Sequence, residues 1–508
     1  MKLRNSTNSM GARRVQRAVA SGILPDVEGG VPPPGALRDF LKPVEESEFF
    51  PPGGTPGLHG RRDACRHRAS EGASVLIIVL WIAVGLVSIA LYFAHSMTFE
   101  LRASDNRTSG LATEQAIEGA ARYVSHVLSN FATNGAVPLK TQFSCEAVAL
   151  GDAHFWIIGR DPSGTVSTKP YFGLIDEGSK LNLNTANTNA LSYLPNMSID
   201  IANAIVDWRS TNGSMSLSYA QLGYLPKHAV FETVDEVRLV DGATFDLLTG
   251  ADINRNGVLD TNEKNVNGTP DYGILEYVTI YSREPNFYPD GTTLTNVNTA
   301  TQQDLQALFQ SANVSSASTR ARDIYRNIHP PPPGQPNLCN GIFDFCVRAR
   351  NVGMTSDEIA QIYNNVTTSA ATYIRGRINV NTASVEVLNA LFLSINIDQN
   401  TASGAAEQLV SYREQNPGNL STVAWVFDSL NGNIITRLRS ADYITTHSYQ
   451  FTADIAATGP FGRGYRRVKF IFDIGDGTPK IIYRQDLSRL GWALGDAVRE
   501  TWLAKETQ

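Results

Sequence analysis

One stretch of twenty apolar residues constrains this chain more than any other feature. Residues 73–99 contain no Asp, Glu, Lys or Arg, and residues 75–94 (VLIIVLWIAVGLVSIALYFA) are apolar almost throughout. A helix of about 20 residues spans the ~30 Å hydrocarbon core of a bilayer. Four arginines lie just before it, at positions 61, 62, 66 and 68. Because positive charge favours the cytoplasmic side, the sequence predicts a single-pass protein with residues 1–72 inside and the bulk of the chain outside the cytoplasm.

The charge balance argues against one broad class of partner. Of the 508 residues, 42% are hydrophobic and 18% are charged, which permits a large core. Residues 1–72 carry 11 Lys and Arg against 8 Asp and Glu, so the remainder has a net charge of −9. An acidic surface repels phosphate, and we therefore expect no nucleic acid partner.

The segments on either side of the apolar run differ in pattern. Residues 1–72 are rich in Pro and Gly and lack hydrophobic periodicity, which predicts a disordered cytoplasmic leader that is removed. Residues 73–130 are predicted to form one helix, because apolar residues recur at helical spacing at 117, 120, 121, 124, 127 and 128. The far half of this helix is therefore expected to pack on a folded domain.

Beyond this helix the pattern predicts one core with a large insertion. Strand patterns in residues 131–185 and 447–490, with glycines between them, predict an antiparallel sheet in an α+β core. Residues 186–446 have a mainly helical pattern and form the predicted insertion, with a stiff proline spacer at 330–333. Residues 491–508 are predicted to be a C-terminal helical tail.

A repeat marks the insertion. The pattern N-[LV]-N-T-A-x4-L begins at Asn182, at Asn296 and at Asn379. It predicts a short strand that enters a helix, with Asn or Thr capping the first free amides. The first and last copies are followed by further helical patterns, so we expect two helix–hairpin–helix subdomains. The middle copy is expected to be degenerate.

The two predicted hairpins bear on what such modules bind. Helix–hairpin–helix modules that bind DNA hold phosphate with the backbone amides of a Gly-rich turn at a helix N-terminus. The corresponding stretches here, residues 195–199 and 394–398, contain neither Gly-x-Gly nor an adjacent Lys or Arg. The hairpins therefore favour protein contacts over nucleic acid.

The start of the apolar helix carries a processing signal. A basic stretch ends at Gly72, and the helix begins at once with Ala73. This junction resembles the cleavage site of type IV prepilin-like proteins, in which a membrane peptidase cuts after the glycine. Most members have Glu as the fifth residue of the mature chain, where it pairs with the N-terminal amine of a neighbour. Here that position is Ile77, which suits a subunit without such a neighbour, because an isolated carboxylate in the membrane is costly.

Taken in order, these features resemble the K-type minor pseudopilin of type II secretion systems. The resemblance covers about residues 70–490 and includes LIDEGSKLN at 174–182, RRV at 466–468 and the strand IIYRQ at 481–485. It implies a pseudopilin fold, in which a long N-terminal transmembrane helix packs on an antiparallel sheet, and a location in the inner membrane with the C-terminal domain in the periplasm. It also implies cleavage and methylation of the new N-terminus by prepilin peptidase.

The same resemblance implies a role and partners. A K-type protein caps the tip of the secretion pseudopilus and helps to initiate its assembly, together with the I- and J-type minor pseudopilins, the major pseudopilin and the inner-membrane secretion platform. Two alternatives remain at this point. One is a membrane-anchored helix–hairpin–helix protein for DNA uptake, and the other is a signal-anchored periplasmic scaffold.

A calcium loop is the sharpest local prediction. Residues 252–263 (DINRNGVLDTNE) match the EF-hand loop D-x-[DN]-x-[DN]-G-x5-E at every required position. Calcium binds six to eight oxygen ligands. The predicted ligands are Asp252, Asn254, Asn256, the carbonyl of Val258, Asp260 and Glu263. Residues 234–248 are expected to be a helix and 275–281 a strand, so the ion would be structural and would fix an edge of the insertion. Calcium binding is also a property of the K-type family.

The sequence carries no recognised catalytic motif. It contains no Gly-x-Ser-x-Gly, P-loop or His-Glu-x-x-His, and we expect no enzymatic activity. Cys339 and Cys346 bracket a short loop and could form a disulfide in an oxidising compartment, or remain as two thiols.

Overall fold

The computed structural model describes residues 71–161, 163, 169–213, 216–258, 260, 263 and 271–506. The chain falls into two compact units with a boundary between Ala83 and Val84. Helix α1 (Glu71–Ser129) begins in the first and ends in the second. Among the described residues, α1 is the one helix that is both long enough and apolar enough to cross a membrane. The candidate membrane-spanning segment begins at Val75. Residues 1–72 were predicted to be disordered. Of these, the structure describes only Glu71 and Gly72, so the prediction for residues 1–70 lies outside the described residues.

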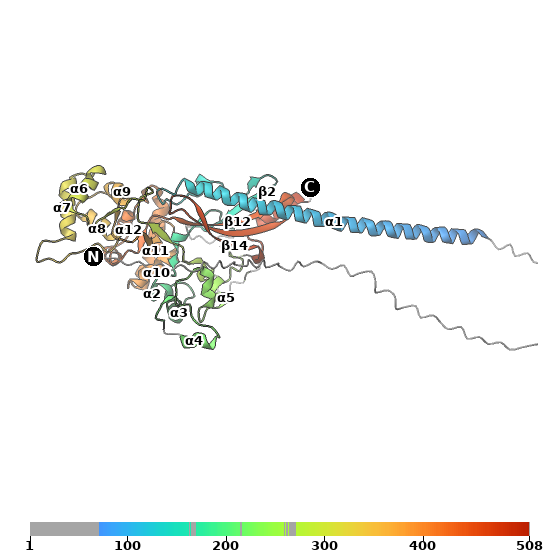
Figure 1. Ribbon diagram of the computed structural model, residues 1–508, viewed down its shortest axis with the longest axis horizontal. Coiled ribbons are helices and arrows are strands. Elements are labelled where there is room, and N and C mark those ends of the chain that lie inside the picture. The colour runs from blue at the N-terminus through green and yellow to red at the C-terminus, as the bar shows by residue number, and fades with distance from the viewer. Residues whose placement is uncertain are drawn as a thin grey trace, which may run out of the picture. The chain divides into compact units, whose positions relative to one another are not determined.

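The far half of α1 packs on an antiparallel sheet. The strand order is β1-β2-β12-β13-β14, and β3 also pairs with β12. Figure 1 shows this part of α1 beside β2 and β12. The apolar positions predicted from helical spacing are all buried, and all of them except Val127 belong to the hydrophobic core that α1 forms with the sheet. The strands are β1 (Val148–Leu150), β2 (Ala153–Ile158), β3 (Ile175–Asp176), β12 (Gln450–Thr458), β13 (Tyr465–Asp473) and β14 (Lys480–Asp486).

The structure confirms a mixed α and β fold with an antiparallel sheet. The sheet takes its first three strands from before the insertion and its last three from after it, as the pattern predicts. Two boundaries differ. Leu181, expected in this sheet, belongs to β4, which pairs with β5 inside the insertion. Ala493 and Leu494, expected in the helical tail, are fully buried in the core beneath the sheet, and helix α14 (Asp496–Glu506) begins only after them.

The insertion holds three modules of one design, where two were expected. In each module, the strand that carries the repeat forms a parallel pair with a strand later in the chain. The helices of the module lie between these two strands in the sequence. The first module has β4 (Leu181–Asn182), α2 (Thr188–Ser192), α3 (Ile199–Arg209), α4 (Ser216–Gln221), the 3-10 helix η3 (Val234–Leu239), α5 (Phe245–Thr249), the 3-10 helix η4 (Ile274–Glu276) and β5 (Val278–Thr279). The second has β7 (Thr295–Asn296), α6 (Gln302–Ser311), α7 (Ala317–Ile328), α8 (Ile342–Asn351), α9 (Ser356–Tyr363) and β8 (Val366–Thr367).

The third module lies against the other two. It has β10 (Ile378–Asn379), α10 (Val385–Ser394), α11 (Gln399–Gln415), the 3-10 helix η6 (Val423–Trp425), α12 (Val426–Ser429), α13 (Gly432–Leu438) and β11 (Ile444–Thr445). Helix α10 packs on α2, while α8 and α9 pack on η6 (Figure 1). Between the modules, β6 (Arg283–Pro285) pairs with β9 (Tyr373–Arg375). The three modules share one continuous hydrophobic core.

The repeated asparagines explain why the modules form. The first Asn of each copy accepts a hydrogen bond from the amide of the second, at 2.9–3.0 Å. The second Asn donates its side-chain amide to a distant carbonyl, that of Phe231, Cys339 or Leu420. Each buried turn thereby satisfies its polar groups and is tied to its own module.

Candidate metal centre and its contact with the sheet

The side chains predicted to bind calcium meet in one loop. The two carboxylate oxygens of Asp252 accept hydrogen bonds from the amides of Asn256 and Gly257 at 3.0 and 2.8 Å. The side-chain amides of Asn254 and Asn256 donate to one oxygen of Asp260 at 2.6 and 3.1 Å. The structure therefore brings Asn254 and Asn256, two predicted ligands in the first half of the loop, to Asp260, the ligand at the ninth loop position.

Glu263 closes the same loop. Its two carboxylate oxygens accept from the amides of Asn254 and Asp260 at 3.2 and 3.0 Å. Gly257 has a φ of +81°, a left-handed conformation that suits glycine at the sharp turn. The amide of Val258 donates to the side chain of Asn256 at 2.9 Å. Leu259, the eighth residue of the loop, lies outside the described residues.

This donor set fits calcium. Every side chain concerned offers hard oxygen, which calcium prefers. Among the described residues no three His, Cys, Asp or Glu side chains group as a metal site on their own, so an ion here requires the amide oxygens of Asn254 and Asn256 as well. Burial raises the pKa of Asp252 to about 6.

The flanks of the loop differ from a full helix–loop–helix. Residues 234–248, expected as one helix, form the 3-10 helix η3 and the short helix α5, which ends three residues before Asp252. After the loop, the described chain enters η4 and the strand β5. The strand predicted for residues 275–281 is confirmed only at Val278–Thr279, since Ile274–Glu276 form the 3-10 helix η4. In the described chain no α-helix directly follows the loop.

The loop is held by the sheet, which sequence reasoning missed. Arg467 on β13 is fully buried and donates to the carbonyls of Asn254 and, at 2.8 Å, Arg255. Its guanidinium also forms a bidentate pair with Asp454 on β12, at 2.8 and 2.5 Å. The planar guanidinium group suits such a junction because its several N–H donors can bind a carboxylate and backbone carbonyls at the same time.

Two further contacts join the loop to the core. Arg160, just after β2, donates to the carbonyl of Arg255 at 3.2 Å. From the C-terminal side, the carbonyls of Trp492 and Ala493 accept from the loop asparagines at 3.1 and 3.4 Å. The loop was expected to fix an edge of the insertion; the structure shows that it joins the insertion to the sheet. No sequence signal identifies this junction, since Arg160 lies 95 residues from its partner along the chain and the other partners lie more than 200 residues away.

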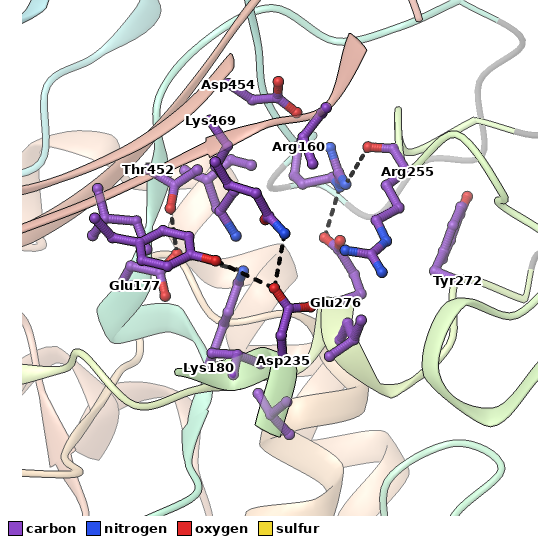
Figure 2. Close-up of a pocket in the computed structure, with 18 of the residues that line it drawn as sticks. Arg160, Glu177, Lys180, Asp235, Arg255, Tyr272, Glu276, Thr452, Asp454 and Lys469 are labelled. Atoms are coloured by element: carbon purple, nitrogen blue, oxygen red, sulfur yellow. Dashed lines mark hydrogen bonds and ion pairs between the residues drawn. The ribbon is translucent and has the colours of Figure 1, made fainter. Parts of the chain in front are cut away.

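A charged cavity of about 70 Å³ lies beside the loop. Figure 2 shows Arg255, Lys180 and Lys469 around it together with Glu177. Burial opposes ionisation of Glu177, but the ammonium groups of Lys180 and Lys469 hold its pKa below the ordinary value. Burial lowers the pKa of Lys469. The sequence did not point to these residues, because each is an isolated charge in its own segment.

The hairpins of the three modules share an unusual residue. Asn196, Asn313 and Asn396 each take a left-handed conformation, with φ between 53° and 63°. Asparagine tolerates this conformation better than most residues because its short side chain bonds locally. The middle copy, which was expected to be degenerate, therefore has the same strand, asparagine network and hairpin as the others.

The middle module does lack one element. In the first module Arg209 donates to the carbonyls of Leu183 and Ala186, and in the third Arg413 donates to those of Val380 and Ala383. The middle module has no such arginine contact among the described residues.

The hairpins are occupied where a phosphate would bind. One amide in the first turn of each second helix already donates to a capping side chain: that of Ile201 in α3 to Ser198, and that of Thr401 in α11 to Asp398. Asn196 donates to the carboxylate of Asp271 at 2.7 Å, which adds negative charge to the first hairpin. These contacts disfavour a DNA backbone at either hairpin.

The other predicted site residues lie elsewhere. Gly72 and Ala73 are in the first turn of α1, and Ile77 is 54% exposed. Cys339 and Cys346 are buried thiols that are not joined, which is the second of the two states that the sequence left open. Burial raises the pKa of Cys339 to about 12 and raises that of Cys346 as well, so both thiols stay protonated and unreactive.

Comparison with known proteins gives limited results. The family described as the helix-hairpin-helix motif matches residues 176–222, which include α2 and α3. No curated protein matches the chain. A solved structure, the GspK-GspI-GspJ complex of the type 2 secretion system from enterotoxigenic Escherichia coli, is similar over 38% of this chain and 75% of its own. Its sequence identity is 15% and its TM-score is 0.15.

Proposed function

We propose that this chain is a K-type minor pseudopilin that caps the tip of a type II secretion pseudopilus and helps to initiate it. The observation that carries the proposal is the course of α1, which begins with an apolar membrane-length segment and continues without interruption onto an antiparallel sheet. The sheet is then interrupted between β3 and β12 by three helical modules. Such an arrangement suits a membrane-anchored subunit whose sheet carries a large helical domain.

The size of the insertion explains how the chain would cap a filament. Filament subunits add by packing their N-terminal helices side by side, and a large insertion on the core would block a further subunit above it. Growth could then proceed only below this subunit. At position 77 an aliphatic residue replaces the usual Glu, which is consistent with a subunit that has no neighbour to supply an amine.

The proposed setting follows from the same features. The helix would anchor the chain in the inner membrane, with the sheet and modules in the periplasm. Prepilin peptidase would cut between Gly72 and Ala73 and methylate the new amine. The partners would be the I- and J-type minor pseudopilins, the major pseudopilin and the inner-membrane platform, and the role would be structural rather than catalytic.

Calcium is proposed as a structural ion of this protein. Asp252, Asn254, Asn256, Asp260 and Glu263 would hold it, with the carbonyl of Val258. Because the sheet clamps the same loop through Arg467, the ion would stabilise the junction between insertion and core. Its weaker, partly amide ligand set suits a calcium-rich compartment.

Co-purification tests the role directly. The full chain, tagged at its C-terminus and extracted in mild detergent from its own cells, should bring down two other minor pseudopilins. A variant whose membrane segment is replaced by an unrelated single-pass helix serves as the matched control and should lose them. Retrieval of neither protein by the native chain would refute the proposal.

A DNA-binding measurement separates the main alternative. A DNA-uptake protein should bind duplex DNA tightly at physiological salt. The occupied hairpin amides and the acidic Asp271 predict no such binding here. Tight, salt-sensitive binding together with absence of pseudopilin partners would favour the DNA-uptake alternative instead.

A further inference from the structure

The three helical modules share one design but differ in what they expose. In the first module, residues 181–279, nine large apolar side chains of the described residues are exposed. The second module, residues 295–367, exposes one such side chain, that of Leu338. The third, residues 378–445, exposes none, and the structure describes all of its residues. The shared design therefore does not require these exposed groups, and they give the first module a surface that the other two lack.

Four of these side chains form one patch where α4 ends. Leu222, Tyr224 and Leu225 follow α4 directly, and Leu225 is 73% exposed. The hydroxyl of Tyr224 donates to the carbonyl of Leu239 at 2.7 Å, so the end of η3 lies against this segment. Figure 1 shows α4 at the outer edge of the insertion. Leu222, Tyr224, Leu225 and Leu239 are called the apolar patch below.

The apolar patch is surrounded by a surplus of negative charge. Residues 222–241 contain four Asp and Glu against two Lys and Arg. Both basic side chains are already engaged: Lys227 pairs with two of these carboxylates, at 3.2 and 3.0 Å, and Arg238 pairs with a third, at 3.4 Å. The fourth carboxylate, that of Asp241, follows the patch residue Leu239 by two positions. Local basic side chains therefore do not balance the acidic ones.

The charge of the whole first module has the same sign. It contains 12 Asp and Glu against 5 Lys and Arg, a net charge of −7, whereas the second module has 5 of each and the third has 6 against 3. One calcium ion in the candidate loop would leave the first module at −5, still the most acidic of the three. A second copy of this surface, a nucleic acid or an anionic lipid surface would be repelled. Its complement is an apolar segment with basic side chains beside it.

We propose that the apolar patch docks another protein, through a segment of aliphatic side chains flanked by Lys or Arg. The aliphatic side chains cover the patch, and the basic ones meet the carboxylates around it. Such an interface has an apolar centre that provides affinity and a charged rim that provides orientation and speed of association. The contact is independent of the proposed place of this chain in a filament, because it uses neither α1 nor the sheet.

The test uses a designed helical peptide as the probe. It has leucines on one face and lysines on the other, and a second peptide has glutamate in place of every lysine. The full chain is placed in nanodiscs of zwitterionic lipid, and binding of the dye-labelled peptide is followed by fluorescence anisotropy, with empty nanodiscs as the blank. We expect saturable binding of the lysine peptide that weakens as salt is added, and binding of the glutamate peptide that is weaker by about tenfold or more.

Two variants and a matched control locate the contact. Leu225→Ser and Leu222→Ser should each weaken binding of the lysine peptide by about tenfold, because each removes one aliphatic side chain from the interface. Their melting temperatures should stay close to that of wild type, since these side chains are exposed in the folded chain. The control, Leu338→Ser, replaces the exposed leucine of the second module and should bind as wild type.

Three results would overturn the proposal. One is equal binding of the lysine and glutamate peptides, and another is wild-type binding by Leu225→Ser. The third is a dimer in analytical ultracentrifugation that Leu225→Ser abolishes and Leu338→Ser keeps, because a second copy of the chain would then be what covers the apolar patch.

Discussion

Replacement of Arg467 by Met should loosen the junction between insertion and sheet. The side chain is fully buried and pairs with Asp454 through both carboxylate oxygens, so the substitution leaves that carboxylate buried and unpaired. Loss of one partner of a buried ion pair costs about 3–5 kcal/mol. For a folded unit of this size, that corresponds to a melting temperature lower by ~3–6 °C. The two loop carbonyls that Arg467 binds also lose their donor.

The measurement is thermal and urea unfolding of the full chain, followed by tryptophan fluorescence. Trp156 on β2 is buried in the same sheet and reports on its opening. The matched control is Arg484→Met on β14, which breaks an exposed pair with Glu118 and a contact of the guanidinium with the ring of Phe470. It should cost about 1–2 kcal/mol, less than the loss of a buried pair.

A double variant separates charge from packing. Arg467→Met combined with Asp454→Leu removes both charges and should regain much of the lost stability, since well-packed apolar residues often replace a buried pair without loss. Equal stability of Arg467→Met and the control, or no recovery in the double variant, would refute the assignment of this pair as the junction.

Four further outcomes are expected. Calcium should raise the melting temperature of wild type above that in chelator and leave Glu263→Ala unchanged; equal values in all four samples would exclude the site. Gly72→Val should keep the leader attached, whereas N-terminal sequencing of wild type should begin at Ala73; any other start contradicts the junction. Ile77→Glu should be neutral or harmful in a secretion assay, and improved assembly would argue for an ordinary filament position. Burial lowers the pKa of His447 to about 4, so its contribution to stability is full above its unfolded pKa of ~6.5 and falls as the pH drops toward 4; unfolding of His447→Phe between pH 7 and 4 should show a shallower loss, and parallel curves would contradict this.

Local sequence patterns predicted those features that local physics determines. Helical spacing alone identified the buried face of α1, because a helix must place its apolar stripe on the core. The spacing of oxygen side chains identified the loop at 252–263, since its ligand positions depend on a few adjacent dihedral angles. The repeated asparagines predicted short strands that enter helices, and each copy does so.

Long-range contacts were beyond reach for a physical reason. The middle copy was expected to be degenerate, yet its second helix, ASTRARDIYRNI, buries one face through Ala321, Ile324 and Ile328 although it is largely polar. Arg467 looked like one of two adjacent strand arginines, and only the three-dimensional arrangement shows which of them turns inward. The cavity residues Lys469 and Arg255 likewise line one cavity only after the sheet and loop are assembled.

The pairing of β2 with β12 means that this sheet is completed late during synthesis of the chain. The two strands are neighbours, although the whole insertion separates them in the chain. Each module pairs its strands over a much shorter separation, so the modules can fold one after another as the chain is synthesised. During that time the apolar face of α1 lacks β12 and β13, the strands that follow the insertion and complete its core. Synthesis of the insertion thus delays completion of the sheet. A chain whose synthesis stops within the insertion would expose that apolar face to chaperones and proteases that bind unfolded protein.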